Sequence, residues 1–151
     1  QYKNAVPLVD LKLAAGMFSE MQSFDPHETA WVELPDIFRP QVGLFVAQVV
    51  GESMNRRIPN GAWCLFRLNP QGSRVGKVVV AQHRSIEDPD LSGAYTVKLY
   101  SSEKRESEEG GWTHTRVSLM PDSDDPSYQT LEIDESTSGE VWIVAELIAI
   151  L

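Results

Sequence analysis

The chain has 151 residues, of which 42% are hydrophobic, so we expect one domain with its own core and at most one attached arm. Its formal net charge is -9, with 13 Lys and Arg against 22 Asp and Glu, which argues against direct binding of nucleic-acid phosphates. No apolar run approaches the roughly 18 residues that span a bilayer, so we expect a soluble protein with no membrane partner.

The N-terminal stretch 5–21 (AVPLVDLKLAAGMFSEM) is apolar, with small residues at Ala14, Ala15 and Gly16. A short helix with a C-cap at Gly16 is one interpretation, which the local pattern favours. The other is an extended arm whose small residues enter a cleft and expose a peptide bond. We take residues 1–28 as an N-terminal arm and 29–151 as the folded domain. Because the chain starts at Gln1 without Met, we also expect upstream sequence to be missing.

Short β-strand patterns separated by Gly, Pro and Asp run through the rest of the chain. The strand-like segments are 29–34, 44–50, 62–66, 77–82, 94–100, 112–120, 128–133 and 141–151. The last of these has a helix as its alternative, but its many β-branched residues favour a strand. No helical period is sustained, so the sequence predicts a mainly β domain with partly closed sheets.

Three connections between these segments are rich in turn-forming or charged residues. Residues 85–93 (SIEDPDLSG) are predicted as a turn region, and 101–111 (SSEKRESEEGG) as a mobile hairpin loop without chemistry. Residues 121–126 (PDSDDP) carry three aspartates, but the calcium-binding pattern with a distal glutamate is absent. We predict a solvated link there.

The stretch 49–66 places a serine between two strand-like segments. Gly51-Glu52-Ser53-Met54 follows the first strand, and Pro59-Asn60-Gly61 forms a turn before the second. A glycine two residues before Ser53 lets the backbone bend tightly, which suits an exposed nucleophile. On the tetrapeptide alone, a helix N-cap is the commoner role for such a serine.

Two lysines and one cysteine lie in or beside the strand-like segments. Lys98 lies in the middle of AYTVKLY, among apolar and aromatic neighbours, where an exposed lysine on an edge strand is the usual explanation. Lys77 opens its strand and reaches water easily. Cys64, the single cysteine, is interpreted as a core residue, and its lack of a disulfide partner fits a reducing cytoplasm. The histidines are scattered, so we expect no metal site and no cofactor.

The order of these motifs resembles the LexA and UmuD family of Ser-Lys self-cleaving peptidase domains, which also occur in phage repressors. The motifs, in chain order, are Ala15-Gly16, Gly51-Glu52-Ser53-Met54 with Ile58 and Gly61, Tyr95-Thr96-Val97-Lys98, and Leu119-Met120-Pro121 with Tyr128. The resemblance runs from about Val6 to Leu151, and it implies the strongly bent β fold shared by LexA and signal peptidases.

The resemblance implies self-cleavage between Ala15 and Gly16, with Ser53 as nucleophile and Lys98 as base. A serine hydroxyl needs a base at neutral pH, and a lysine serves only when it is uncharged. Lowering a lysine pKa from about 10.4 toward 7 or 8 requires desolvation of roughly 3 to 4 kcal/mol. Burial by neighbouring strand residues and by the inserted arm is the expected source.

The same resemblance implies that backbone N–H groups at the elbow hold the oxyanion. The elbow candidates, beside Ser53 itself, are Gly51, Glu52 and Met54. Two departures from the family pattern concern this region: Ala62 stands where an acidic residue is usual, and Asn55-Arg56-Arg57 brings two cations close to the site.

The resemblance also implies a regulatory context: a bacterial DNA-damage (SOS) response, DNA repair, transcription regulation or another DNA-processing system. We expect a homodimer, and we expect an upstream DNA-binding or helicase domain outside this chain. The helicase alternative is included because the tract 49–67 is also similar to C-terminal modules of large helicase or nuclease proteins. Three functions stay open: a self-cleaving switch, a Ser-Lys peptidase acting on another chain, and a non-catalytic dimerisation or docking module.

Overall fold

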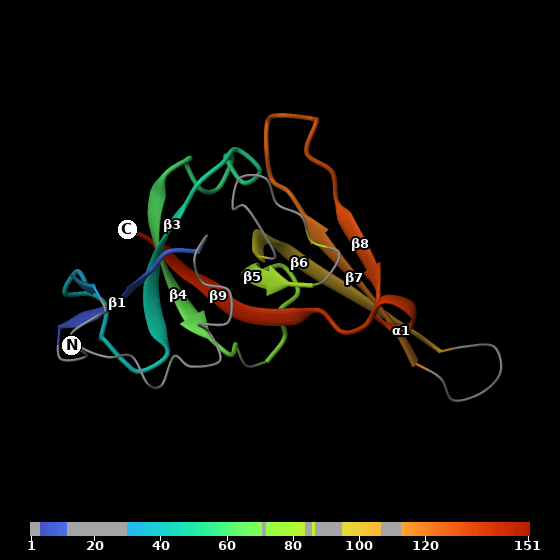
Figure 1. Cartoon of the computed structure of the whole chain (residues 1–151), viewed down its shortest axis with the longest axis horizontal. Coiled ribbons are helices and arrows are strands. Elements are labelled where there is room, and N and C mark those ends of the chain that lie inside the picture. The colour runs from blue at the N-terminus through green and yellow to red at the C-terminus, as the bar shows by residue number, and fades with distance from the viewer. Residues whose placement is uncertain (1–3, 12–29, 71, 84–85, 87–94, 107–112) are drawn as a thin grey trace.

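The computed structural model describes residues 4–11, 30–70, 72–83, 86, 95–106 and 113–151. Within these residues the chain forms nine strands and one short helix (Figure 1). The elements are β1 (Ala5–Val9), β2 (Trp31–Glu33), β3 (Leu44–Val49), β4 (Ala62–Leu68), β5 (Val78–Gln82), β6 (Tyr95–Glu106), β7 (Thr113–Met120), β8 (Leu131–Asp134), α1 (Glu135–Ser138) and β9 (Trp142–Ile150). The predicted mainly β fold is confirmed.

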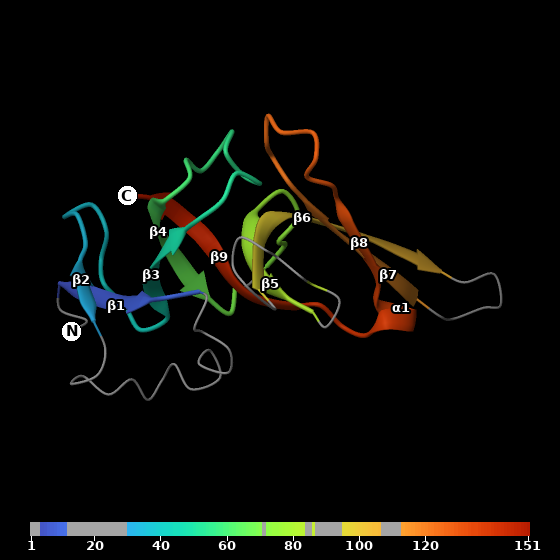
Figure 2. The same ribbon diagram turned by 45° about the horizontal axis from the view of Figure 1, so that its top comes forward.

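The nine strands of the described residues form one mixed, open sheet in the order β2-β1-β3-β4-β9-β5-β6-β7-β8. Only the β1–β3 pair among these is parallel, and the other neighbours are antiparallel. Figures 1 and 2 show the long β9 crossing between the β1–β4 end and the β6–β8 end of the twisted sheet. The strand interpretation of 141–151 is therefore confirmed over β9, which lies centrally between β4 and β5.

The central strands are buried on both faces, which explains their nearly continuous apolar sequence. In β5, Val78 and Val80 belong to one buried cluster, while Val79 and Ala81 belong to another on the opposite face. A sheet that packs apolar side chains on both faces at its centre gives a rigid base for the loops at its edges.

The charged stretch after Tyr100 corrects one prediction. Residues 101–106, predicted as a mobile loop, continue β6 and pair with β7 in register, with Ser101 opposite Ser118 and Glu103 opposite Arg116. Polar and charged cross-strand pairs such as these stabilise a strand without apolar alternation, so this sequence lacks the usual strand signal. Residues 107–111 of the predicted loop lie outside the described residues.

The N-terminal stretch is described only in part. Its residues 5–9 form β1, an extended strand paired with β2 and β3, so this part is not helical. The candidate cleavage site Ala15-Gly16 and the arm boundary at residue 28 lie outside the described residues, as does most of the predicted turn 85–93. In the described part of the chain, no helix is long and apolar enough to cross a membrane.

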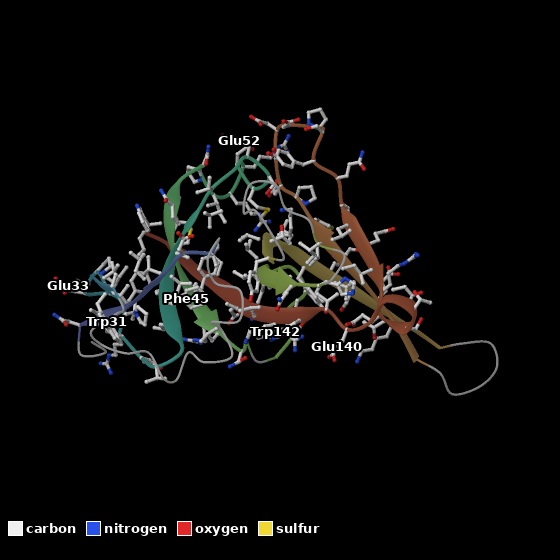
Figure 3. All side chains as sticks on the ribbon, in the orientation of Figure 1. Trp31, Glu33, Phe45, Glu52, Glu140 and Trp142 are labelled. Atoms are coloured by element: carbon white, nitrogen blue, oxygen red, sulfur yellow. The ribbon has the colours of Figure 1, made fainter. Side chains whose placement is uncertain are left out.

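Two connections far apart in sequence meet at one edge of the sheet. Figures 1 and 2 show the β3–β4 connection reaching the β7–β8 connection, and Figure 3 places Glu52 at this meeting point. Backbone hydrogen bonds join them: the Asp122 N–H donates to the Ser53 carbonyl over 2.9 Å, and the Arg56 N–H donates to the Asp122 carbonyl over 3.1 Å. The candidate nucleophile therefore lies between two loops held together.

Candidate active site

The elbow, residues 51–58, begins with a backbone bend that requires glycine. Gly51 has φ 109°, a conformation that side-chain-bearing residues rarely adopt. Its N–H donates to the Asn60 side-chain oxygen over 2.8 Å, which ties the start of the elbow to the turn before β4. Successive turns, not an α-helix, follow Gly51, so the helix N-cap interpretation of Ser53 is wrong.

Side chains before and after Ser53 hold the elbow in place, through burial in the core and through hydrogen bonds. Met54 and Ile58 are each 1% exposed and anchor it in the core. The exposed Glu52 carboxylate accepts hydrogen bonds from the side-chain amides of Asn60 and Asn55, each over 3.1 Å. Glu52 therefore ties the start of the elbow to its middle and to the turn before β4, which restrains the chain around Ser53.

The Lys98 amine reaches Ser53 from the neighbouring strand. Lys98 Nζ lies 3.0 Å from Ser53 Oγ, a hydrogen-bonding distance. At Lys98, β6 pairs with β5 through Val79, whereas its pairing with β7 begins only at the next residue. The elbow lies beside this point, and Lys98 is partly buried and contacts Ser53, so the solvated-lysine interpretation is wrong.

Thr96 also contacts the Lys98 amine, and sequence reasoning did not single it out. Its Oγ1 accepts a hydrogen bond from Lys98 Nζ over 2.7 Å, and the Val97 carbonyl accepts a second over 3.2 Å. Thr96 is only 4% exposed. The period-two pattern carried the signal, because residues two apart in a strand share a face.

One comparison with known proteins covers almost the entire chain. A model of the Peptidase S24-like family matches residues 7–148. The chain belongs to this family. The resemblance drawn from the motifs is thereby confirmed, and the matched range includes Ser53, Lys98 and the pair Ala15-Gly16. No curated protein matches the chain significantly.

The chain therefore has an S24 domain, which has a Ser-Lys peptidase fold. Members of this family are typically serine peptidases. Family membership alone leaves open the role of each residue in this chain. The catalytic assignment of Ser53 and Lys98, the cleavage site Ala15-Gly16 and the oxyanion contribution of Gly51, Glu52 and Met54 therefore stay predictions.

Two other titratable groups, Cys64 and Lys77, lie in environments that are explained by packing and ion pairing. Cys64 has no exposed surface, and burial raises its thiol pKa to about 11, so its prediction as a core residue is confirmed. Lys77 forms an ion pair with the nearly buried Glu146 over 3.0 Å. No cluster of His, Cys, Asp and Glu suited to a metal ion occurs among the residues that the structure describes.

A cavity of about 240 Å³ lies where β1 and β3 end, next to the start of the elbow. It is lined by residues 8–11 of the N-terminal stretch together with Gln48, Val50 and Trp63. Leu11, at its edge, is buried in the same cluster as Val49 and Met54. The N-terminal stretch therefore leaves the described part of the chain close to the elbow.

Proposed function

We propose that the S24 domain is a Ser-Lys peptidase that cuts its own chain between Ala15 and Gly16, as a regulatory switch. The observation that carries this proposal is the 3.0 Å contact between Lys98 Nζ and Ser53 Oγ, made across 45 residues of sequence at a partly buried position. A hydroxyl in contact with an amine that can become neutral is the minimum arrangement for nucleophilic catalysis without histidine.

The surroundings of Lys98 fit the work of a base. A neutral amine has two hydrogens and one lone pair. When Lys98 is neutral, Thr96 Oγ1 and the Val97 carbonyl can accept its two hydrogens, and its lone pair can accept the Ser53 hydroxyl proton. The same contacts restrict rotation of a long side chain that would otherwise sample many conformers.

The proposed reaction uses Ser53 as the nucleophile and Lys98 as the base. As Ser53 Oγ bonds to the carbonyl carbon of Ala15, its proton passes to Lys98 Nζ, and the resulting oxyanion is held by backbone N–H groups of the elbow. The C–N bond to Gly16 then breaks while Lys98 returns the proton to the leaving amine. Water hydrolyses the Ala15 ester on Ser53 and restores the hydroxyl.

Chain length supports an intramolecular substrate. Leu11 shares a buried cluster with Met54, the neighbour of Ser53. Ala15 lies four positions after Leu11, and four residues of extended chain span at most about 14 Å. A scissile bond tethered this close is presented to Ser53 at high effective concentration.

Small residues at the scissile bond suit a narrow approach beside the elbow. Cutting after Ala15 breaks the covalent link between the segments on its two sides, which is the logic of a switch. We place this switch in a cytoplasmic DNA-damage, repressor or DNA-processing system, with an upstream DNA-binding or helicase domain as the regulated part.

Incubation of the purified chain at mildly alkaline pH tests the proposal. Mass spectrometry is expected to find a fragment that begins at Gly16, and the Ser53→Ala and Lys98→Ala variants are expected to stay intact. A chain that stays intact but trims an added peptide would support a peptidase acting on other proteins. Inertness under both conditions would support the non-catalytic module.

A second candidate function, self-association, is favoured by one observation. Four large apolar side chains on β4 and at the end of β9 are 37–46% exposed, namely Trp63, Ile148, Ile150 and Leu151. All four lie where the start of β4 pairs with the end of β9: Ile150 is opposite Cys64, and the Leu151 N–H donates to the Trp63 carbonyl over 2.8 Å. We propose that this apolar patch forms the homodimer contact. Sedimentation analysis tests it: Ile150→Glu is expected to give monomers, and an unchanged dimer would contradict the assignment.

A further inference from the structure

The acidic loop, residues 121–126, is fastened to the elbow by side chains as well as by backbone. Arg57 Nε donates to Asp122 Oδ2 over 2.7 Å. Asn55 and Asp124 bond reciprocally: the Asn55 amide donates to Asp124 Oδ1 over 2.6 Å, and its oxygen accepts the Asp124 N–H over 3.0 Å. We call these contacts the clasp. They join segments 65 to 69 residues apart in sequence.

The clasp bears directly on the candidate nucleophile. Asp122, whose carboxylate is held by Arg57, is the residue whose N–H donates to the Ser53 carbonyl. Holding that carbonyl restrains the backbone of residue 53, from which the Ser53 side chain projects. Displacement of the acidic loop would therefore move Ser53 Oγ relative to Lys98 Nζ.

A contribution to the stability of the folded state does not explain the clasp well. The Arg57 and Asp122 side chains are 49% and 26% exposed, and an ion pair so open to water contributes little to folding. Geometry is a better explanation, because a displacement of about 1 Å in a reacting group costs on the order of 100-fold in rate.

The acidic loop is itself braced, so it can act as a rigid support. The Ser127 N–H donates to the Asp125 carboxylate over 2.9 Å, and hydrogen bonds from Ser127 hold the pKa of that carboxyl below its usual range. The Asp125 N–H in turn donates to Ser123 Oγ over 3.0 Å. A loop with these local bonds keeps its shape while its other side chains contact the elbow.

We propose that Asn55 and Arg57 are positioning residues for Ser53. By holding Asp124 and Asp122, they press the acidic loop against the elbow, and the Asp122 N–H keeps Ser53 Oγ in contact with Lys98. The proposal rests on the proposed function for its effect on rate, but the positioning of Ser53 is measurable without cleavage. It assigns a role to two residues of the Asn55-Arg56-Arg57 stretch, one of the places where the chain departs from the family pattern.

Arg56 provides a matched control for Arg57. Both are cations next to the site, and Arg56→Ala removes the same charge as Arg57→Ala. In the part of the chain that the structure describes, Arg57 is paired with Asp122 whereas Arg56 has no ion pair. A general electrostatic effect on Lys98 would therefore appear in both variants, and loss of the clasp only in one.

The first experiment measures the self-cleavage rate against pH. Asn55→Ala and Arg57→Ala are expected to lower the high-pH plateau about 10- to 100-fold without moving the pH midpoint, because the base is unchanged. Arg56→Ala and the remote Asn4→Ala are expected to stay within about twofold of the wild type. Arg57→Lys, which keeps a cation near Asp122, is expected to recover part of the rate and guards against a folding defect.

The second experiment needs no cleavage. In the uncleavable Ser53→Ala background, NMR measures hydrogen exchange at the Asp122 amide, which bonds to the backbone carbonyl of residue 53. Exchange is expected to accelerate at least about tenfold in Asn55→Ala and Arg57→Ala but not in Arg56→Ala. Unchanged exchange, or equal rate losses in Arg56→Ala and Arg57→Ala, would overturn the positioning role. A wild-type chain that is never cut contradicts the proposed function, and the exchange result then decides the positioning of residue 53 alone.

Discussion

Lys98 Nζ lies 2.7 Å from Thr96 Oγ1, closer than to Ser53 Oγ at 3.0 Å. The two side chains come from the same face of β6, two residues apart, and Thr96 is almost completely buried. A lysine held in this way has its amine aimed before any substrate arrives, which lowers the entropic cost of the reactive arrangement.

Replacing Thr96 tests this contact. Thr96→Val keeps the branched shape but removes the oxygen that accepts from Lys98, so we expect the self-cleavage rate to fall about 10- to 100-fold. Thr96→Ser retains the oxygen and is expected to keep most of the activity. Single-turnover cleavage followed by gel densitometry gives both rates, and equal rates for Val and Ser would contradict the role.

The pH dependence of cleavage follows from the neutral state of the base. Below the Lys98 pKa, each unit rise in pH increases the fraction of free amine, and the rate, about tenfold, until the amine is deprotonated. Lys98→Arg, whose guanidinium stays protonated, is expected to be inactive over the whole range. A rate that falls with rising pH in a folded chain would exclude an amine base.

Cys64 limits the pH range of such experiments. Burial raises its pKa from 9.0 to about 11, so the unfolded chain loses this proton first as pH rises. Between these values the unfolded state binds fewer protons than the folded state, and the free energy of unfolding decreases with pH. We expect urea midpoints of the wild type to fall above about pH 9, and those of Cys64→Ala to fall less. Identical pH slopes would contradict the burial effect.

Gly51 is expected to serve both stability and cleavage. At φ 109°, Gly51→Ala is strained and is expected to lower the free energy of unfolding by about 1–2 kcal/mol. Gly72, at φ 78° in the β4–β5 connection, is a matched control with similar strain far from the elbow. Urea unfolding is expected to show comparable losses, whereas the cleavage rate falls in Gly51→Ala alone.

Local patterns in the sequence predicted the strands of the core, but taken alone they favoured a helix N-cap for Ser53 and a solvated edge-strand lysine for Lys98. The apolar runs before and after the elbow became β3 and β4, because burial on both faces dictates their composition. The motif order placed Ser53 and Lys98 in one site, and family knowledge carried that inference, since no local pattern links residues 45 positions apart.

Features that depend on a distant partner were not predictable. The charged sequence of residues 101–106 indicates a loop. It extends β6 because it pairs with β7, a partner that local sequence does not reveal. The acidic loop looks like a solvated link because nothing near it in sequence shows that Asp122 and Asp124 contact Arg57 and Asn55. Tertiary pairing overrides local propensity in both cases.

Covalent labelling of Ser53 tests the central claim most directly, because it needs neither the arm nor any partner. A fluorophosphonate reacts with a serine only when a base activates it. Peptide mass spectrometry of the wild type is expected to find the adduct on Ser53, forming faster as pH rises. Lys98→Met, which keeps the length of the side chain without its amine, is expected to give no adduct at Ser53. Equal labelling of Ser53 in the wild type and in Lys98→Met, or none in either, would contradict the Ser-Lys pair.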